Sequence, residues 1–138
     1  MNLVGIYTDL HAALPLLYRL LEEREPHQNI SHKRMPTWRE HEDFVMSVPY
    51  AAWYLCVEDE PVGAVYLSKQ REVGIGILRQ FQGRGHAEAA VTELMRLHPR
   101  GRFLANINPA NEASIALFRK LGFGGPIQVT LELDAHRK

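Results

Sequence analysis

The stretch 72–87 constrains the fold of this chain more than any other part of the sequence. Val73, Ile75 and Ile77 alternate with other residues, and this period of two predicts a strand with one apolar face. A glycine-bearing turn follows directly, and apolar residues then recur at helical spacing over 87–95. A strand that turns tightly into an amphipathic helix indicates a sheet on which helices pack.

The opposite face of that expected strand is unusual. It carries Glu72, Gly74, Gly76 and Leu78, so a carboxylate stands beside two positions without side chains. Glycine weakens a strand, and the close approach of a ligand or another backbone is one reason to tolerate it. A bulge, or tight packing against a helix, explains the pattern equally well. The residues leave a ligand site and a packing site as alternatives.

The turn itself, Gln82-Gly83-Arg84-Gly85-His86, lies where an anion site is expected. Exposed N–H groups at a helix N-terminus attract phosphate together with the helix dipole, and small residues let it come close. The turn has neither the Gly-Lys-Ser/Thr ending of a P-loop nor the spacing of a dinucleotide fingerprint. An ordinary tight turn remains the alternative.

The rest of the chain predicts further strands and helices. Strands are expected over 1–8, 51–57, 62–67, 102–107 and 127–133, and helices over 10–21, 37–47 and 113–121, with Pro15 as a kink or a start in the first of them. The order is βααβββαβαβ, an α/β (α+β) mixed sheet packed by helices. At 138 residues with no internal repeat, we expect one domain, 1–138.

Composition narrows the chemistry only by exclusion. The chain has 16 basic and 16 acidic side chains, and this balance argues against nucleic acid or an anionic membrane as a partner. No apolar run approaches the roughly 20 residues of a membrane span, and we expect no signal peptide. The single cysteine, Cys56, permits no internal disulfide and favours a reducing, cytoplasmic location. No histidine spacing suggests zinc, so we expect no metal site.

Two blocks resemble signatures of the GNAT (Gcn5-related) N-acetyltransferase family. Gln82-x-x-Gly85-x-Ala87 is similar to the loop that cradles the pyrophosphate of acetyl-CoA in that family. The segment 111–123, Asn-Glu-Ala-Ser-Ile-Ala-Leu-Phe-Arg-Lys-Leu-Gly-Phe, is similar to the helix after the family's fifth strand. The resemblance covers 50–133, and within the family it is greatest to RimJ/RimL-like and amino-sugar N-acetyltransferases. It implies a mostly antiparallel sheet of six to seven strands, in which strands four and five splay apart.

The resemblance implies acetyl-CoA as cosubstrate and a primary amine as acceptor, on a small molecule, an amino sugar or a peptide. The glycine turn would hold the pyrophosphate, the end of the fourth strand would pair with the pantetheine amides, and Asn111 would bond the pantetheine arm or cap its helix. Main-chain N–H near Leu78 would steady the oxyanion. The implied cofactor-binding residues are Ile77, Leu78, Gln82, Gly83, Arg84, Gly85, His86, Ala87, Asn111 and Phe118.

Catalysis requires a base, because an amine at neutral pH is mostly protonated and must lose a proton before it attacks a thioester. Glu72 resembles the family's strand-four glutamate and is our candidate, acting through a water; a surface carboxylate paired with a neighbouring basic residue is the alternative. His41 is a second candidate base. Phe118 stands where the family often has a tyrosine that protonates the CoA thiolate, so Tyr66 or a water would have to replace that donor.

Phe118 also keeps a second function open, a catalytically degenerate module that binds acyl-CoA as a sensor or in an interaction. A nucleotide-binding regulatory domain would use the same turn, but the block 111–123 disfavours it. The residues before 50 correspond to the part of the family where acceptor specificity usually lies. Trp38 and Tyr50 are expected to line an acceptor pocket there, and Lys33-Arg34 could recognise an anionic acceptor, although solvated charge is the commoner explanation. A homodimer is compatible with the resemblance.

Overall fold

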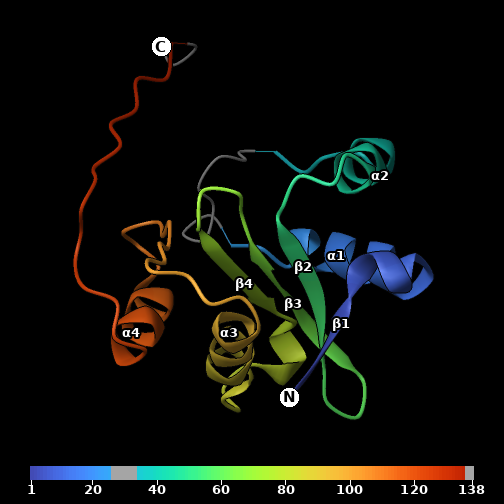
Figure 1. Ribbon diagram of the computed structural model, residues 1–138. Helices are drawn as coiled ribbons and strands as arrows, with labels where there is room; N and C mark the ends of the chain where they lie inside the picture. Colours follow the sequence, from blue (N-terminus) through green and yellow to red (C-terminus); the bar gives the residue numbers. More distant parts are fainter. Residues whose placement is uncertain (26–33, 136–138) are drawn as a thin grey trace.

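Four strands form the sheet in the computed structural model, which describes residues 1–25 and 34–135 (Figure 1). They are β1 (Asn2–Gly5), β2 (Ala52–Val57), β3 (Pro61–Leu67) and β4 (Val73–Ile77). The strands lie in the order β1-β2-β3-β4, and every neighbouring pair is antiparallel. Short turns join β2 to β3 and β3 to β4, and such turns can only connect antiparallel neighbours.

One face of the sheet is covered by α1 (Leu10–Glu22) and α2 (Trp38–Met46). A short 3₁₀ helix, η1 (Ile6–Thr8), leads into α1, which begins where Asp9 accepts a hydrogen bond from the N–H of Ala12 at 3.3 Å. Pro15 lies inside α1 and does not end it. The buried side chains beneath these helices are Ile6, Ala13, Leu17, Val45, Leu55 and Ala64.

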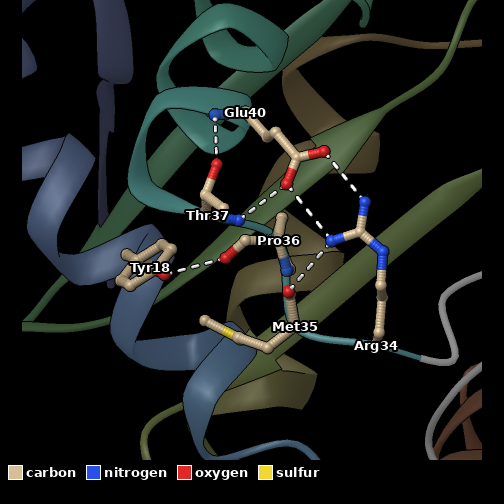
Figure 2. Close-up of polar contacts among 6 residues, drawn as sticks. All are labelled: Tyr18, Arg34, Met35, Pro36, Thr37 and Glu40. Atoms are coloured by element: carbon tan, nitrogen blue, oxygen red, sulfur yellow. Dashed lines mark hydrogen bonds and ion pairs between the residues drawn. The ribbon is translucent and has the colours of Figure 1, made fainter.

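The start of α2 confirms the expected capping box. Thr37 accepts a hydrogen bond from the N–H of Glu40 at 3.1 Å, and the Glu40 carboxylate accepts one from the N–H of Thr37 at 2.9 Å (Figure 2). The same carboxylate pairs with Arg34 at 3.0 Å, and the Tyr18 hydroxyl of α1 donates to the carbonyl of Pro36 at 2.8 Å. The chain before α2 is therefore tied to both helices. The Arg34–Glu40 pair lowers the pKa of Glu40 to about 2.

The other face of the sheet packs against α3 (His86–Leu97) and α4 (Glu112–Lys120). The spacing expected from residue 87 onward is confirmed, because Ala90, Val91 and Leu94 of α3 are fully buried. They share a core with Val65 and Leu67 of β3, Val73 of β4 and Phe118 of α4. The sheet thus lies between two helical layers.

The expected number of strands was wrong: the described residues form four, not six to seven. In 102–107 only Leu104 pairs, in an isolated parallel bridge with Glu72. The segment 127–133 forms no strand, and its side chains are exposed. Alternating apolar residues predict which side chains face a core, but a strand also needs a neighbour for its backbone groups. Among residues 1–25 and 34–135, neither segment has that neighbour along its whole length.

Candidate functional site

The turn between β4 and α3 faces open space. After β4 comes a 3₁₀ helix, η3 (Arg79–Phe81), and then Gly83 and Gly85 with φ angles of 79° and 81°. This left-handed region is costly for residues with a side chain. A Cβ atom built on either glycine would meet nothing within 4 Å. These glycines therefore serve the backbone conformation and leave the space above it accessible.

The first turn of α3 has no side-chain cap. Its N-cap residue is Gly85, and no side chain accepts a hydrogen bond there. The N–H groups of a first helical turn have no acceptor within the helix, and residues 82–85 are exposed. Together with the helix dipole, these N–H groups suit an anion such as a phosphate.

Charged side chains around this turn leave it favourable to an anion. The guanidinium of Arg84 lies 5.8 Å from the centre of the Phe81 ring, which holds its positive charge at the turn. Glu88, in the first turn of α3, would repel an anion, but Lys120 of α4 pairs with its carboxylate at 2.9 Å. His86 lies 3.7 Å from the Glu58 carboxylate.

The backbone of β4 leaves an open edge next to this turn. Just past β4, the N–H of Leu78 donates to the carbonyl of Val62 at 2.9 Å, across to β3. Backbone groups alternate in direction along a strand. The N–H and C=O groups of Ile75 and Ile77 therefore point the other way, out of the β3–β4 ladder.

The segment 102–107 meets that edge at one point only. The N–H of Val73 donates to the carbonyl of Leu104 at 2.8 Å, and the N–H of Leu104 donates to the carbonyl of Arg71 at 2.9 Å. The described residues show no further pairing between β4 and this segment beyond the Glu72–Leu104 bridge. The two therefore separate after Leu104, as expected of splayed strands four and five.

Both backbone groups of Leu78 are engaged within the protein. Its N–H donates to the carbonyl of Val62, and its carbonyl accepts a hydrogen bond from the N–H of Phe81 at 2.8 Å. The predicted pairing of Leu78 with the pantetheine arm stays a prediction, which these contacts disfavour. The N–H of Ile77 points out of the ladder and is available to a ligand. The Ile77 carbonyl accepts a hydrogen bond from the side-chain amide of Gln82 at 3.0 Å. Ile75, which the sequence pattern did not single out, also directs its N–H and C=O out of the β3–β4 ladder.

The space beside the two glycines of β4 is filled by other side chains of the protein. A Cβ at Gly74 would overlap the ring of Tyr66, its cross-strand partner, and a Cβ at Gly76 would lie 3.5 Å from Leu20 of α1. Of the two alternatives for this face, the structure supports packing. The Tyr66 ring in turn stacks on Tyr50, with centres 3.9 Å apart and planes within 6°. Trp53 meets the Tyr50 ring edge-on at 4.7 Å.

Glu72 and Arg24 lie close enough to this aromatic stack to act on it electrostatically. Burial above all raises the pKa of the Tyr50 and Tyr66 hydroxyls, the Glu72 carboxylate raises both pKa values further, and Arg24 lowers them. Both hydroxyls stay protonated at neutral pH. No sequence pattern marks Arg24, which stands in a run of glutamates at the end of α1.

The Glu72 side chain is partly buried and held by one neighbour. Its carboxylate accepts a hydrogen bond from the Ser68 hydroxyl at 3.3 Å, and the same hydroxyl oxygen accepts the N–H of Glu72 at 3.0 Å. Among the described residues, Glu72 is thus bound to a serine rather than to a basic side chain. The Ser68 hydroxyl therefore orients the carboxylate.

His41 has a structural position. It is 3% exposed, its Nε2 lies 3.0 Å from the carbonyl of Leu14, and its ring packs against Tyr18 and Trp38. A carbonyl only accepts hydrogen bonds, so Nε2 carries the proton. His41 ties α2 to α1, and this buried, hydrogen-bonded position disfavours its predicted part as a base. Lys33, which was considered with Arg34 as a contact of an anionic acceptor, lies outside the described residues.

The block 111–123 also has mainly structural contacts. Asn111 caps α4 by accepting the N–H of Ser114 at 3.2 Å. Phe118 is 4% exposed and meets Phe123 edge-on at 5.0 Å. The structure places Phe118 in the core beneath α3 and α4.

Over 1–25 and 34–135, the side chains of His, Cys, Asp and Glu do not gather in threes as metal ligands would. None of the helices in these ranges has the length and apolarity that crossing a membrane requires.

The fold and the site define a class of protein in which an antiparallel sheet carries an exposed glycine turn beside an unpaired strand edge. Residues 14–123 match the family model described as the acetyltransferase (GNAT) family. The chain belongs to this family. Comparison with curated protein sequences gives no match.

Solved structures share the fold at low sequence identity. A domain from Methanocaldococcus jannaschii is 24% identical, with a TM-score of 0.70 over 89% of this chain and 87% of that one. The ribosomal-protein-alanine N-acetyltransferase from Brucella melitensis is 18% identical, with a TM-score of 0.65 over 88% and 83%. A phosphinothricin acetyltransferase from Sinorhizobium meliloti, in complex with AcCoA, is 21% identical, with a TM-score of 0.66 over 88% and 73%.

Proposed function

We propose that this protein transfers an acetyl group from acetyl-CoA to a primary amine. The observation that carries the proposal is the uncapped, exposed N-terminus of α3 next to the open edge of β4. An anion site and unpaired backbone amides side by side suit the pyrophosphate and the amide-bearing arm of CoA. Family membership supports the same reaction class, and the S. meliloti relative was solved with AcCoA.

The cosubstrate lies along β4 in this proposal. The N–H groups of the turn, from Gly83 to Ala87, hold the pyrophosphate. The free N–H of Ile77 bonds the pantetheine arm, and Ile75 offers its N–H nearer to Glu72. The five residues of β4 span about 17 Å, so the phosphate site and Glu72 stand at opposite ends of an extended ligand.

Glu72 acts as the general base, through a water. The ammonium loses one proton through the water to Glu72, and the neutral amine nitrogen bonds to the thioester carbonyl carbon while the carbonyl electron pair moves onto oxygen. When the oxyanion re-forms the carbonyl, the C–S bond breaks and its electron pair leaves with sulfur. The amide nitrogen gives its second proton to solvent water. The N–H of Ile75 steadies the oxyanion, because preorganised donors act most strongly where charge develops. The serine that holds Glu72 keeps the carboxylate in one position.

The thiolate leaves without a strong acid beside it. Phe118 has no proton to donate, and the raised pKa of Tyr66 makes its hydroxyl a weaker acid than a thiol, whose reference pKa is about 8.5. A thiolate of that pKa is a fair leaving group, and water protonates it after it departs. Tyr66 therefore acts in our proposal as a wall of the acceptor site.

The acceptor is a small-molecule or peptide amine. Two similar structures support this class, since one is named for ribosomal-protein alanine and the other for phosphinothricin. The stack of Tyr50 on Tyr66, with Glu72 and Arg24 nearby, forms the acceptor side. We further propose one acetyltransferase domain over 1–138, because both helical layers share one sheet. The buried Cys56, whose pKa is raised to about 12, remains a thiol and suits a cytoplasmic location.

Ligand binding tests the first half of the proposal. Acetyl-CoA should raise the Tm of the purified chain, whereas ATP and NAD should leave it nearly unchanged because they lack the pantetheine arm. At a concentration 100 times Kd, the stabilisation is about 2.7 kcal/mol. A rise with ATP or NAD and none with acetyl-CoA would refute the acetyl-CoA site. Binding without CoA release over a library of amines would favour the non-catalytic module.

Replacement of the base tests the second half. Glu72→Gln should lower kcat/KM about 100-fold or more at neutral pH, a typical loss for a general base. The defect should shrink as pH rises towards the amine pKa, near 10 for a lysine-like acceptor, because solvent then deprotonates the amine. Glu42→Gln, an exposed position on α2, is the matched control and should retain full activity. Equal activity of both variants across the pH range would exclude Glu72 as the base.

A further inference from the structure

A row of side chains covers the face of β4 that packs against α1. Glu72 stands just before the strand, and the Tyr66 ring lies over Gly74. Leu20 of α1 lies over Gly76, 3.5 Å from the position that a Cβ atom would take there. Along this face, a carboxylate is therefore followed by an aromatic ring and then by the last turn of α1.

Arg24 lies at the far end of this row. Its N–H donates to the carbonyl of Leu21 at 3.2 Å, so the chain continues in a further turn beyond α1. Residues four apart lie on the same side of a helix, which places the Arg24 side chain on the side of Leu20, towards β4. The end of α1 is fixed there, because the Glu23 carboxylate accepts a hydrogen bond from the N–H of Arg79 at 2.6 Å.

The guanidinium of Arg24 is not neutralised by the carboxylates beside it. Glu23 pairs with Arg19 at 3.2 Å, and Glu25 pairs with Arg79 at 3.3 Å. Within 1–25 and 34–135, no acidic side chain forms an ion pair with Arg24, which is exposed. A long cationic side chain without a protein partner, directed towards a site, suits an anionic group of a ligand.

Arg24 and Glu72 flank one aromatic surface. The Tyr66 ring stacks on Tyr50 with ring centres 3.9 Å apart. Burial is the main cause that raises the pKa of both hydroxyls; Arg24 lowers these pKa values and Glu72 raises them, so both charges act on the stack. The surface thus has a negative group at one side, a flat and uncharged middle, and a positive group at the other side.

We propose, on the basis of the acetyltransferase function above, that the acceptor amine also carries a carboxylate, which Arg24 binds while the amine lies at Glu72. A guanidinium binds a carboxylate through two parallel hydrogen bonds. The uncharged part of the acceptor then lies on the stack of Tyr66 and Tyr50. Arg24 repels a molecule whose second group is also an ammonium, so the same residue selects against diamines.

Two matched amines test the preference for a carboxylate. Para-aminomethylbenzoate and para-aminomethylbenzamide share the ring and the amine, and they differ in the charge of the second group. With acetyl-CoA, the unmodified chain should acetylate the benzoate with a kcat/KM about 10- to 100-fold higher, the effect expected of hydrogen bonds to a charged group. Equal kcat/KM values for the two amines, or a preference for the benzamide, would overturn the proposal.

Replacement of Arg24 tests whether this residue causes the preference. Arg24→Gln should raise KM for the benzoate to the value for the benzamide and leave kcat nearly unchanged, because it removes binding that substrate and transition state share. Arg24→Lys keeps the charge and should regain part of the preference. Arg100→Gln is the matched control: Arg100 is exposed and donates to the carbonyl of the adjacent Pro99 at 3.0 Å. An unchanged preference in Arg24→Gln would show that Arg24 is only a solvated charge.

Reversal of the charge gives a test that a misfolded variant cannot pass. Arg24→Glu should acetylate para-xylylenediamine with a higher kcat/KM than the benzoate, whereas the unmodified chain should show the opposite order. The same order in both chains would contradict a contact between Arg24 and the second group of the acceptor.

Binding without turnover separates the carboxylate site from the acetyltransferase reaction. CoA has no acetyl group to transfer, so the benzoate should raise the Tm of the CoA-bound chain more than the benzamide does, and this difference should vanish in Arg24→Gln. If that difference is found while no amine is acetylated, the carboxylate site stands and the reaction is refuted. If both amines are acetylated with equal kcat/KM, the reaction stands and the carboxylate site is refuted.

Discussion

The glycines of the turn and the glycines of β4 serve opposite purposes. Gly83 and Gly85 have left-handed backbones, and side chains added there would enter open space. Gly74 and Gly76 have ordinary strand backbones, and side chains added there would meet Tyr66 and Leu20. The first pair leaves room for a ligand, while the second leaves room for the protein itself. Glycine in a sequence predicts a close approach without saying what approaches.

The turn glycines and the β4 glycines therefore belong to two different kinds of surface in the site. The glycine turn offers backbone N–H groups directly, so its chemistry depends on main-chain conformation. The β4 glycines act indirectly, since Gly74 lets Tyr66 lie over the strand and stack on Tyr50. We therefore expect substitutions in β4 to change stability first, and substitutions in the turn to change acetyl-CoA binding first.

Gly74→Ala should have the largest effect. Its Cβ would overlap the Tyr66 ring, so the ring must move and the stack with Tyr50 must break. Overpacking of this kind costs about 2 kcal/mol, which corresponds to a fall in Tm of about 8 °C for a domain of this size. Thermal unfolding measures the fall. KM for the amine should also rise, because the acceptor wall has moved.

A double variant checks the cause of that loss. Tyr66→Ala removes the ring, so Gly74→Ala should cost much less in that background than in the natural chain. If the losses of Tm caused by Gly74→Ala and Tyr66→Ala simply add, overlap with the Tyr66 ring is not the reason that glycine is needed at position 74. The β4 glycines would then not differ from the turn glycines in the way described above.

Gly85→Ala should have a smaller effect on stability and a clear effect on ligand binding. A left-handed alanine costs about 1 kcal/mol, and the exposed turn can relax to relieve it. We expect a Tm only about 4 °C lower and an affinity for acetyl-CoA about tenfold weaker, since relaxation turns the N–H groups away from the phosphate. Isothermal titration calorimetry measures the affinity.

Asparagine at position 85 distinguishes the effect of the left-handed backbone conformation from the effect of filling the space above the turn. Asparagine adopts the left-handed backbone more readily than alanine, so Gly85→Asn should regain most of the lost Tm. It should not regain the affinity, because its side chain fills the space above the turn. Full affinity in both variants would mean that acetyl-CoA does not approach Gly85.

The features that could be predicted from the sequence depend on neighbours along the chain. The capping box at Thr37 and Glu40 is confirmed because both partners lie within one helical turn. The buried face of α3 is confirmed because helical spacing alone decides it. The direction of the backbone groups of Leu78 and Ile75 could not be predicted, for the opposite reason. Which residues of β4 direct their backbone groups outward depends on the register with β3, and that register is a long-range property.

The same limit explains the misjudged strands and residues. The strand expected over 102–107 failed because pairing also requires a neighbouring strand along its length, which the described residues do not supply. His41 has the residue type of a base, but its contact with Leu14 across two helices makes it structural. Arg24 reaches the aromatic stack only through the fold. Local patterns specify helices and turns, whereas the assembly of the site requires contacts between distant segments.

Gly76→Ala should have the smallest effect on stability, and it should raise the Tm rather than lower it. The added Cβ would lie 3.5 Å from the nearest Leu20 side-chain atom, which is an ordinary contact, and the backbone is already extended. Alanine loses less backbone entropy than glycine on folding, by about 0.5–1 kcal/mol. We therefore expect a Tm about 2 °C higher and an unchanged affinity for acetyl-CoA. A loss of affinity in this variant would mean that the glycines of β4 also face the ligand, and the strand and the turn would then form one continuous binding surface.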